Sequence, residues 1–334
     1  MPAGLGGGGY LALVHEVTMG TYLDPSTAGA VFIPIISESL AYQEDKYYSS
    51  QIRQQTIVSD VKQSYYHVAG DIVMEVDSSL LPYLLYCGRY TITKTGAGSP
   101  WSYKFVPSQA GSATTGTGAN ERTASLTVVR NGIGFGYGGC CLTGGEFTVD
   151  NGVLRFTANI LGMSQATPAA LGTPTWAAPK LLGANAHSVY VAASGVTPTF
   201  GAASLDFNGF TFTQNFNAAA QNRIVANRAA TYIAFGETEA TYNTELDFVN
   251  KTEYDNFQSS TQRAVKLESI GDGAAWAATA DGVQIQINRS AYDSYEVGLA
   301  GMGDLIMATV NGRVLGIAGG DPYAITVKSS ASIT

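Results

Sequence analysis

The residues of this chain that could perform chemistry are few, and they lie far apart. The three histidines, His15, His67 and His187, belong to different kinds of segment. The sequence contains neither a His-Glu-x-x-His nor a Cys-x-x-Cys motif, so it lacks the spacing that metal ligands usually show. We therefore expect each histidine to face solvent or to be hydrogen-bonded, and we predict no metal site.

A glycine-rich segment and an acidic pair are two further candidates. Residues 134–139 match G-x-G-x-x-G, but no helix is predicted after them whose N-terminus could hold a pyrophosphate. Their alternating glycine and aromatic residues are more typical of a crowded strand. Glu44 and Asp45 could act together in sugar hydrolysis, although a solvated acidic surface explains them more simply. No G-x-S-x-G motif occurs, and we predict neither catalytic residues nor a cofactor.

The composition favours a β protein. Thirty-nine glycines, many Thr, Ser, Tyr and Val residues and only 13% charged residues favour strands and turns over helices. The net charge of −8 argues against a protein that grips nucleic acid, because phosphate binding needs clustered Lys and Arg. No apolar segment approaches the ~20 residues of a membrane-spanning helix, and residues 1–16 do not resemble a signal peptide. The three cysteines do not form a disulfide framework.

The most informative segment is a long predicted hairpin, residues 38–77. Apolar residues share one face of its second strand, namely Val68, Ile72, Met74 and Val76, together with Gly70. The other face carries His67, Asp71, Val73 and Glu75. Such alternation buries one face of a strand and exposes the other. Because a two-stranded ribbon is only marginally stable alone and its free edges accept further strands, the hairpin predicts oligomerisation.

The rest of the chain is predicted to form two β halves, residues 38–164 and 201–334, after an N-terminal arm and first strand in residues 1–37. Asn-Gly pairs at 131–132 and 151–152 predict hairpin turns. Short helices are predicted near residues 79–88 and 252–257, with Ser79 and Thr252 as their capping residues. Residues 165–200 contain four prolines and are predicted to be a loop or linker. No fixed-period repeat is evident.

The order of these segments resembles the tail tube (major tail) proteins of long-tailed bacteriophages. The residues that carry the likeness are GTYLDPSTAGAVFIPI at 20–35, then GDIVMEVD followed by SSLLPYLLYCG, and later RTASLTVVRNG, YGGCCLTGGEFTVDNG, FNGFTFTQNFN, KTEYDNF and SYEVGLAGMGDLI. The likeness spans nearly the whole chain, but residues 165–200 match nothing in the family pattern.

The resemblance implies an all-β fold, a β-sandwich with one or two short helices and a long protruding hairpin that forms an inter-subunit β-barrel. It implies a structural virion protein, neither an enzyme nor a cofactor protein, that forms stacked and usually hexameric rings. The implied partners are further copies of the chain, the tape measure protein and DNA inside the tube, and tail terminator and baseplate or tail-tip proteins, with no membrane. Assembly would take place in the cytoplasm of the bacterial host.

By its position in this resemblance, the hairpin at 38–77 would supply strands that line the lumen. Its acids outnumber its Lys and Arg residues, and unpaired carboxylates would keep passing DNA from binding. The candidates for lining the lumen are Glu44, Asp45, Asp60, Asp71 and Glu75. The candidates for contact with a neighbouring subunit are Tyr47, Tyr48, Ile52, Ile57, Tyr65, Ile72 and Met74.

Two other functions stay open at this point. A carbohydrate-binding β-sandwich protein would use Tyr-rich strands and mobile Gly/Ser loops as binding platforms, and it would remain monomeric or form small closed oligomers. A hydrolase that uses paired carboxylates is the third possibility, and loss of turnover on a single Asp→Asn change would identify it.

Overall fold

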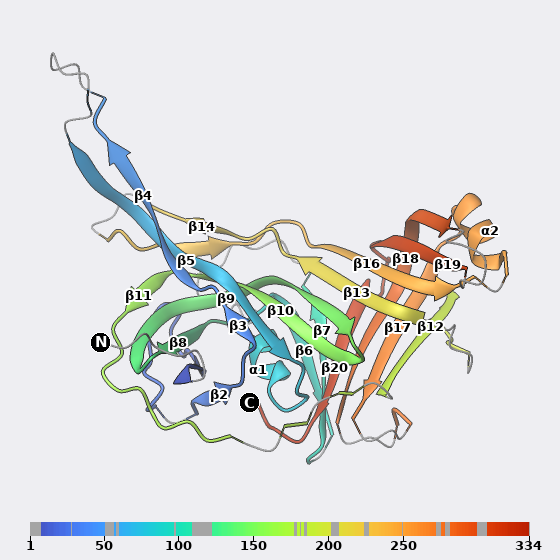
Figure 1. The fold of residues 1–334 in the computed structure, drawn as a ribbon, viewed down its shortest axis with the longest axis horizontal. Helices are drawn as coiled ribbons and strands as arrows, with labels where there is room; N and C mark the ends of the chain where they lie inside the picture. The colour runs from blue at the N-terminus through green and yellow to red at the C-terminus, as the bar shows by residue number, and fades with distance from the viewer. Residues whose placement is uncertain are drawn as a thin grey trace.

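The computed structural model describes residues 8–27, 29–50, 57, 60–96, 98–108, 122–176, 179–180, 182–183, 186–201, 207–223, 227–248, 250–271, 275–277, 281–298 and 306–333. Within these ranges the chain is mostly β-strand, with two short helices. Strands pack in layers around a shared core, and one hairpin extends away from the body (Figure 1). The predicted all-β fold class is confirmed.

The largest layer is one continuous antiparallel sheet. In the described part of the chain its order is β4 (Ala41–Tyr48), β5 (Val61–Glu75), β10 (Val153–Gly162), β9 (Ile133–Asp150), β13 (Phe207–Asn215), β16 (Glu239–Asp247), β19 (Met307–Val314) and β18 (Gly282–Gly298). The short strand β3 (Ser37–Glu38) extends the line of β4 along β5. Because side chains alternate along each strand, one face is buried and the other is polar. We call this layer the polar-faced sheet.

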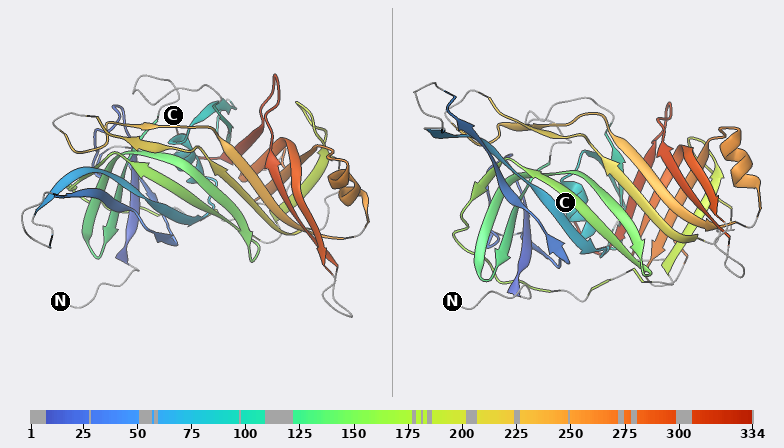
Figure 2. Two further views of the ribbon diagram at one scale, coloured as in Figure 1. Left: turned by 90° about the horizontal axis from the view of Figure 1, so that it is seen from above. Right: turned by 45° about the horizontal axis from the view of Figure 1, so that its top comes forward.

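Two of these strands, β9 and β18, are long enough to enter a second layer (Figure 2). The first half of β9 pairs with β8 (Ala124–Arg130) and β11 (Ser164–Ala166), and the sheet continues through β1 (Tyr10–His15) to β2 (Val31–Ile33). The first half of β18 pairs with β17 (Arg263–Ile270) and β20 (Tyr323–Ser329), and this sheet continues to β12 (His187–Ala193), β7 (Trp101–Pro107) and β6 (Tyr90–Thr95). A separate ribbon joins β14 (Ala219–Gln221) to β15 (Tyr232–Ala234).

The core between the layers is rich in aromatic side chains. The rings of Phe147 and Phe156 stack with their centroids 4.3 Å apart, and burial of each such ring contributes about 1.5–3 kcal/mol. Two buried tyrosines find a polar partner in the amide of Gln214, which donates to the Tyr90 hydroxyl and accepts from the Tyr323 hydroxyl at 2.9 Å. These bonds satisfy polar groups that would be costly to bury alone.

The helices form where the sequence predicts them, as α1 (Leu81–Tyr86) and α2 (Thr252–Gln258), but the predicted caps are wrong. The N-cap positions belong to Leu80 and Lys251, and neither helix has a side-chain cap hydrogen bond. The Ser79 hydroxyl instead donates to the Asp77 carboxylate at 2.5 Å. Asp77 also accepts a hydrogen bond from the Ser79 backbone N–H. Ser79 therefore bonds to Asp77 and does not cap α1.

The two Asn-Gly turns are confirmed. Asn131 and Gly132 have φ angles of 50° and 76°, and Asn151 and Gly152 have angles of 48° and 72°, the left-handed pair that a type I′ hairpin turn requires. The prediction of a loop or linker across residues 165–200 is wrong for part of that range, because β12 forms there and pairs with β17. The flanking prolines hide this short strand in the sequence.

Candidate functional site

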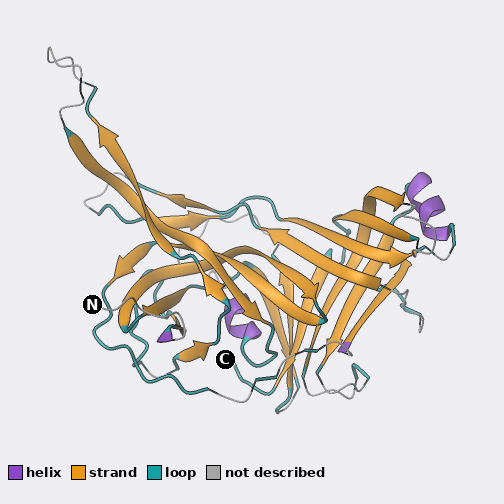
Figure 3. Ribbon diagram, in the orientation of Figure 1, coloured by secondary structure: helices purple, strands orange, loops and turns teal. Residues whose placement is uncertain are grey.

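The predicted hairpin forms, and its far part extends beyond the body of the subunit (Figures 1 and 3). We call the part of β4 and β5 that extends past the end of β10, with the described residues between them, the arm. Its predicted apolar face is buried, since Val68, Ile72, Met74 and Val76 have no exposed surface. The opposite face of β5 continues the polar side of the sheet. Asp71 is exposed there, and Glu75 is half-buried.

The acidic residues predicted to line a lumen lie in three different environments. Asp71 accepts a hydrogen bond from the Asn159 amide at 2.7 Å, and Glu75 stands opposite Arg155 across the β5–β10 pair. Asp45 and Asp60 are exposed on the arm, away from the sheet, and Asp60 lies 3.4 Å from Lys62. Glu44 is only 10% exposed and forms an ion pair with Arg228. Glu44 is therefore a structural carboxylate and not the unpaired acid that we expected.

The residues predicted to contact a neighbouring subunit also lie in different environments. Three are exposed on the arm: Tyr47 at 60%, Tyr48 at 59% and Ile57 at 81%. Tyr65 is half-buried, and Ile52 lies outside the described residues. Ile72 and Met74 are completely buried in the core of their own subunit. The prediction that these two side chains contact a neighbouring subunit is wrong, because side chains alternate between the two faces of β5 and these two lie on its buried face.

Arg228 fixes the base of the arm. Its guanidinium donates to the Ser64 carbonyl at 2.9 Å and to the Gln63 side chain at 2.8 Å, in addition to the ion pair with Glu44. The backbone adds two bonds, from Tyr66 N–H to the Arg228 carbonyl and from Ala230 N–H to the Tyr66 carbonyl. Sequence analysis missed this residue because its partners lie more than 160 positions away.

The exposed side of the polar-faced sheet is a larger surface than the hairpin alone. It is rich in Thr and Asn, and its side chains bond to one another across strands: Thr213 donates to Glu146, Asn243 to Asn311, and Asn311 to Ser294. Its carboxylates outnumber its two arginines, Arg155 and Arg313, and are those of Asp71, Glu75, Glu146, Glu239, Glu245, Asp247 and Glu296. The polar and apolar alternation within residues 207–215, 239–247 and 307–313 is the signal that could have identified it.

Both edges of this sheet are open in the described structure. β4 pairs with β5 on one side only, and the second half of β18, residues 291–298, pairs only with β19. Large apolar side chains are exposed at these edges, among them Tyr42 on β4 and Val297 on β18. Unpaired strand edges with exposed apolar side chains accept strands from other chains.

Two of the histidines and the glycine-rich segment, which the sequence offered as candidates for chemistry, have structural roles in the fold. His15 bonds the Tyr83 carbonyl and stacks on Tyr86, and burial lowers its pKa. His187 contacts Ser269 and the Gly152 carbonyl, and burial lowers its pKa as well. The glycines of 134–139 lie in β9, where a Cβ on Gly136 would collide with Tyr22. Among the described residues, no group of three or more His, Cys, Asp or Glu side chains could hold a metal ion.

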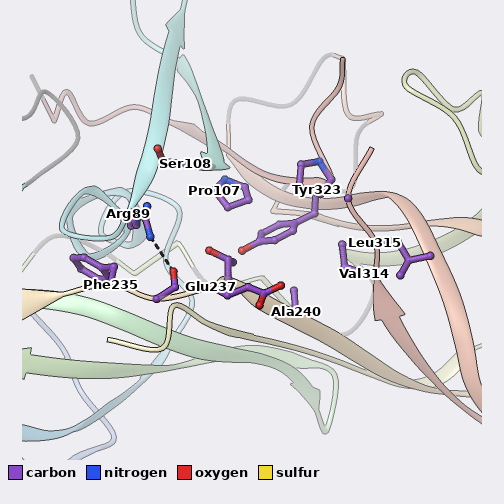
Figure 4. A pocket seen from close by; sticks show the side chains of 13 residues that line it. Arg89, Pro107, Ser108, Phe235, Glu237, Ala240, Val314, Leu315 and Tyr323 are labelled. Atoms are coloured by element: carbon purple, nitrogen blue, oxygen red, sulfur yellow. Dashed lines mark hydrogen bonds between the residues drawn. The ribbon is translucent and has the colours of Figure 1, made fainter. Parts of the chain in front are cut away.

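A cavity of about 520 Å³ lies beside β7, β16, β19 and β20 (Figure 4). The Arg89 guanidinium at its border donates to the Gly236 carbonyl at 3.0 Å and lies over the ring of Phe235. The Tyr323 hydroxyl is bonded to Gln214. These groups serve the packing of the sheet ends, and they do not converge on one point as a catalytic set would. No helix in the described ranges is long and apolar enough to cross a membrane.

An antiparallel sheet with two open edges, one polar face and a protruding arm defines a structural subunit of a larger assembly. The family comparison agrees with this class: residues 6–314 match the family model described as phage tail tube protein. The chain belongs to the phage tail tube protein family, and it is a structural component of the virion tail. No curated protein matches the chain.

Proposed function

We propose that copies of this chain join through their open sheet edges into closed rings, and that stacked rings form the tube through which DNA leaves the phage. The polar face of the sheet would line the lumen as an inter-subunit β-barrel. One observation carries the proposal: a single sheet in the described chain has a continuous polar face and an open strand edge at each end. Closing such edges into a barrel removes them.

The charge on the polar face suits a conduit. DNA that touched many subunits at once would be held if each one attracted it by only ~0.5 kcal/mol, the strength of one exposed ion pair. Here the carboxylates outnumber Arg155 and Arg313, so the net interaction with phosphates is repulsive. Asp71 and Glu75 belong to this lining. The Thr and Asn side chains between the acids are neutral and are bonded to one another.

The arm has the character of a contact between subunits. Tyr47, Tyr48 and Ile57 expose apolar surface that nothing in the described part of the subunit covers. Burial of such side chains against a neighbour contributes about 1.5–3 kcal/mol each. We assign the arm to the contact with an adjacent subunit, in the same ring or in the next ring of the stack.

The remaining parts of the proposal follow from the family. The resemblance implies stacked and usually hexameric rings, a lumen that encloses the tape measure protein before DNA, and ends that meet the tail terminator and the baseplate or tail-tip proteins. Assembly would take place in the host cytoplasm, and we propose no enzymatic activity for the chain.

Negative-stain electron microscopy of the purified protein, over a series of concentrations and salt strengths, tests this function. Hollow filaments of uniform width built from stacked rings are the expected result. A glycan-binding screen on the same sample provides the opposing measurement. Dispersed monomers under every condition, together with saturable glycan binding, would replace the tube by a carbohydrate-binding role.

A further inference from the structure

The two halves of the chain have the same topology, although the sequence shows no repeat. Apart from β2, β3, β6 and β7 in the first half and β14 and β15 in the second, the elements of the first half follow the order β1, β4, β5, α1, β8, β9, β10 and β11, and those of the second half follow the order β12, β13, β16, α2, β17, β18, β19 and β20. The pairings correspond as well: β1–β8 with β12–β17, β4–β5 with β13–β16, β5–β10 with β16–β19, β8–β9 with β17–β18, β10–β9 with β18–β19, and β11–β9 with β18–β20.

The register shifts between paired strands also occur at equivalent places in the two halves. The β8–β9 pair shifts register between Ala124 and Leu126, and the β17–β18 pair shifts between Arg263 and Val265. Further along the same long strands, the β9–β10 pair has an irregularity beside Thr143, and the β18–β19 pair has one beside Asp293. Bulges are specific features of a fold. Two of them at equivalent places in each half show one architecture used twice.

The second bulge aligns the halves residue by residue. Gly144 corresponds to Ser294 on the long strands, and Asn159 corresponds to Asn311 on the strands opposite them. With this alignment several polar-face residues prove identical, namely Glu146 with Glu296, Thr157 with Thr309, and Asn159 with Asn311. We call the first unit, from β1 to β11, module 1, and the second unit, from β12 to β20, module 2.

Within the polar-faced sheet the modules are joined by one strand pair, β9 with β13, which runs antiparallel. Outside that sheet, β20 also pairs with β7, a strand of the first half that has no equivalent in the second. In that pair Gly144 stands opposite Asn215, Gly145 opposite Gln214, and Glu146 opposite Thr213. The equivalent of β9 in module 2 is β18, and the equivalent of β13 in module 1 is β4. These are the two edge strands of the polar-faced sheet, and their outer edges are open in the described structure.

We infer that the internal junction is repeated between chains, so that β18 of one copy pairs antiparallel with β4 of the next. This inference rests on the proposed function and names the surface through which the ring closes. The alignment gives its register: Ser294 faces Gln43, Tyr295 faces Tyr42, and Glu296 faces Ala41 of the neighbouring copy. Because the sheet has eight alternating strands in the described chain, its edge strands run in opposite directions, and the antiparallel ladder continues from copy to copy.

The side chains at the two open edges support this register. Tyr42 is 36% exposed at one edge, and Val297 is 39% exposed at the other. The Tyr295 hydroxyl is buried without a hydrogen-bond partner among the described residues. In the internal junction the opposing rings of Phe147 and Phe212 are fully buried. The ladder would stop near Leu40, whose carbonyl already accepts bonds from Arg130 and Tyr137.

The repeat also changes the number of chains in a ring. A ring of six modules needs three chains, whose eight strands each give 24 strands. At ~4.8 Å between strands such a barrel is roughly 37 Å across at the backbone before strand tilt widens it, and one of six chains would be roughly 73 Å across on the same basis. The narrower barrel leaves room for one DNA duplex between its side chains. In place of the six chains of a hexameric ring, we therefore assign three chains with two modules each.

Disulfide trapping in the assembled full-length protein tests the junction. Gln43 and Ser294 carry side chains on the polar face, where the register makes them a non-hydrogen-bonded pair with Cα atoms about 4.5 Å apart, within reach of a disulfide. The variant with Gln43→Cys and Ser294→Cys should cross-link after mild oxidation. A second in-register pair, Ala41→Cys with Glu296→Cys, guards against local damage by either change. The native cysteines are buried and provide a background measured in the parent chain.

The matched control combines Gln43→Cys with Glu296→Cys, a diagonal pair about 7–8 Å apart that lies beyond disulfide reach. The in-register variants should give a ladder on a non-reducing gel that ends at three chains, while the control stays monomeric. Tubes without cross-links, or a ladder that ends at six, would overturn the inference and leave the tube function standing. Failure of the parent chain to assemble at all would reject both.

Discussion

The two modules differ in the connection between their first two polar-face strands. In module 1 the strands β4 and β5 continue beyond the sheet as the exposed arm, whereas the connection from β13 to β16 in module 2 turns back and forms the β14–β15 ribbon beside the base of that arm (Figure 1). Arg228, in the second connection, forms an ion pair with Glu44 of β4 at the base of the arm. One position in the fold has therefore produced an arm in one module and its brace in the other.

The two connections also differ in how they are covered. Ala230 and Ile233 of the brace are buried against Leu161 and Met163 of the subunit. The arm has no such cover over Tyr47 and Tyr48 in the described structure. The brace is complete within one chain, while the arm is completed by a neighbour. The predictions below test this division of roles.

The largest effect is expected from charge at the exposed part of the arm. Tyr47→Asp with Tyr48→Asp should abolish tube formation and leave the thermal midpoint of the subunit unchanged, because both rings are exposed in the isolated chain. Sedimentation of assembled protein measures the loss. Ile133→Asp, at another exposed apolar residue, is the control and should sediment like the parent. Equal sedimentation of all three proteins would show that the arm is not an interface.

Removing the brace contact should come next. Arg228→Ala leaves the largely buried Glu44 carboxylate without its cation, which is costly, and frees the arm to move. We expect faster amide exchange in β4 and β5 and a rise of about tenfold in the concentration needed for assembly, equivalent to about 1.4 kcal/mol. Arg223→Ala, which among the described residues loses a contact with the ring of Tyr232, should change neither. An identical response of the two variants would remove Arg228 from the account.

A glycine in each module offers a graded comparison of packing. Gly70 faces Ile160 in module 1, and the equivalent pair in module 2 is Tyr242 with Gly312, so the large and small positions are exchanged. A Cβ on Gly70 would lie 2.5 Å from the Ser39 carbonyl oxygen, whereas one on Gly312 would meet the Tyr242 ring. Backbone yields less than a side chain, so Gly70→Ala should cost about 3 kcal/mol and Gly312→Ala about 1 kcal/mol.

Denaturant unfolding of the two variants measures this difference. Tyr242→Leu in the Gly312→Ala background should recover part of the loss, because it removes the ring that the new methyl group meets. No such partner change is available for Gly70, whose obstacle is backbone. Equal costs at the two glycines would mean that the modules pack alike at this position.

Reversing charge at the equivalent acids of both modules should affect DNA without affecting folding. Glu146→Lys with Glu296→Lys leaves five carboxylates against four cations on the proposed lining, so tubes of this variant should hold more duplex DNA than parent tubes at about 50 mM salt and lose that difference near 200 mM. Asp255→Lys makes the same kind of charge change on α2, which packs against Tyr295 on the apolar side of the sheet. DNA retention by the control, or its absence in the double variant, would contradict the assignment of the lumen face.

The smallest expected effect is a dependence of stability on pH. Burial lowers the pKa of His15 in module 1 and of His187 in module 2. The unfolded chain therefore takes up protons below its ordinary histidine pKa of about 6.5, before the folded chain does. The free energy of unfolding should fall by about 1 kcal/mol between pH 7 and 5.5. His187→Gln should reduce that slope, and a slope unchanged by either histidine would show that other groups cause it.

The parts of the fold that could be predicted are those whose pattern lies within a single strand or turn. The alternation of β5 and the two Asn-Gly turns are local patterns, and both are confirmed. The repeat could not be predicted, because the aligned strands share few residues and the equivalence lies in pairing and bulges. The same holds for the partner of Glu44, which lies 184 positions away. A carboxylate that looks unpaired in sequence acquires its cation only when the second module folds beside the first.

Electron cryomicroscopy of the assembled tube tests the central claim most directly, since it resolves the ring symmetry, the lumen face and the strand junction in one map. The account predicts three chains per ring with two equivalent modules each, Asp71, Glu146 and Glu296 facing the lumen, and β18 paired with β4 of the next chain. A ring of six chains, or a lumen lined by the apolar side of the sheet with β18 and β4 apart, would contradict it.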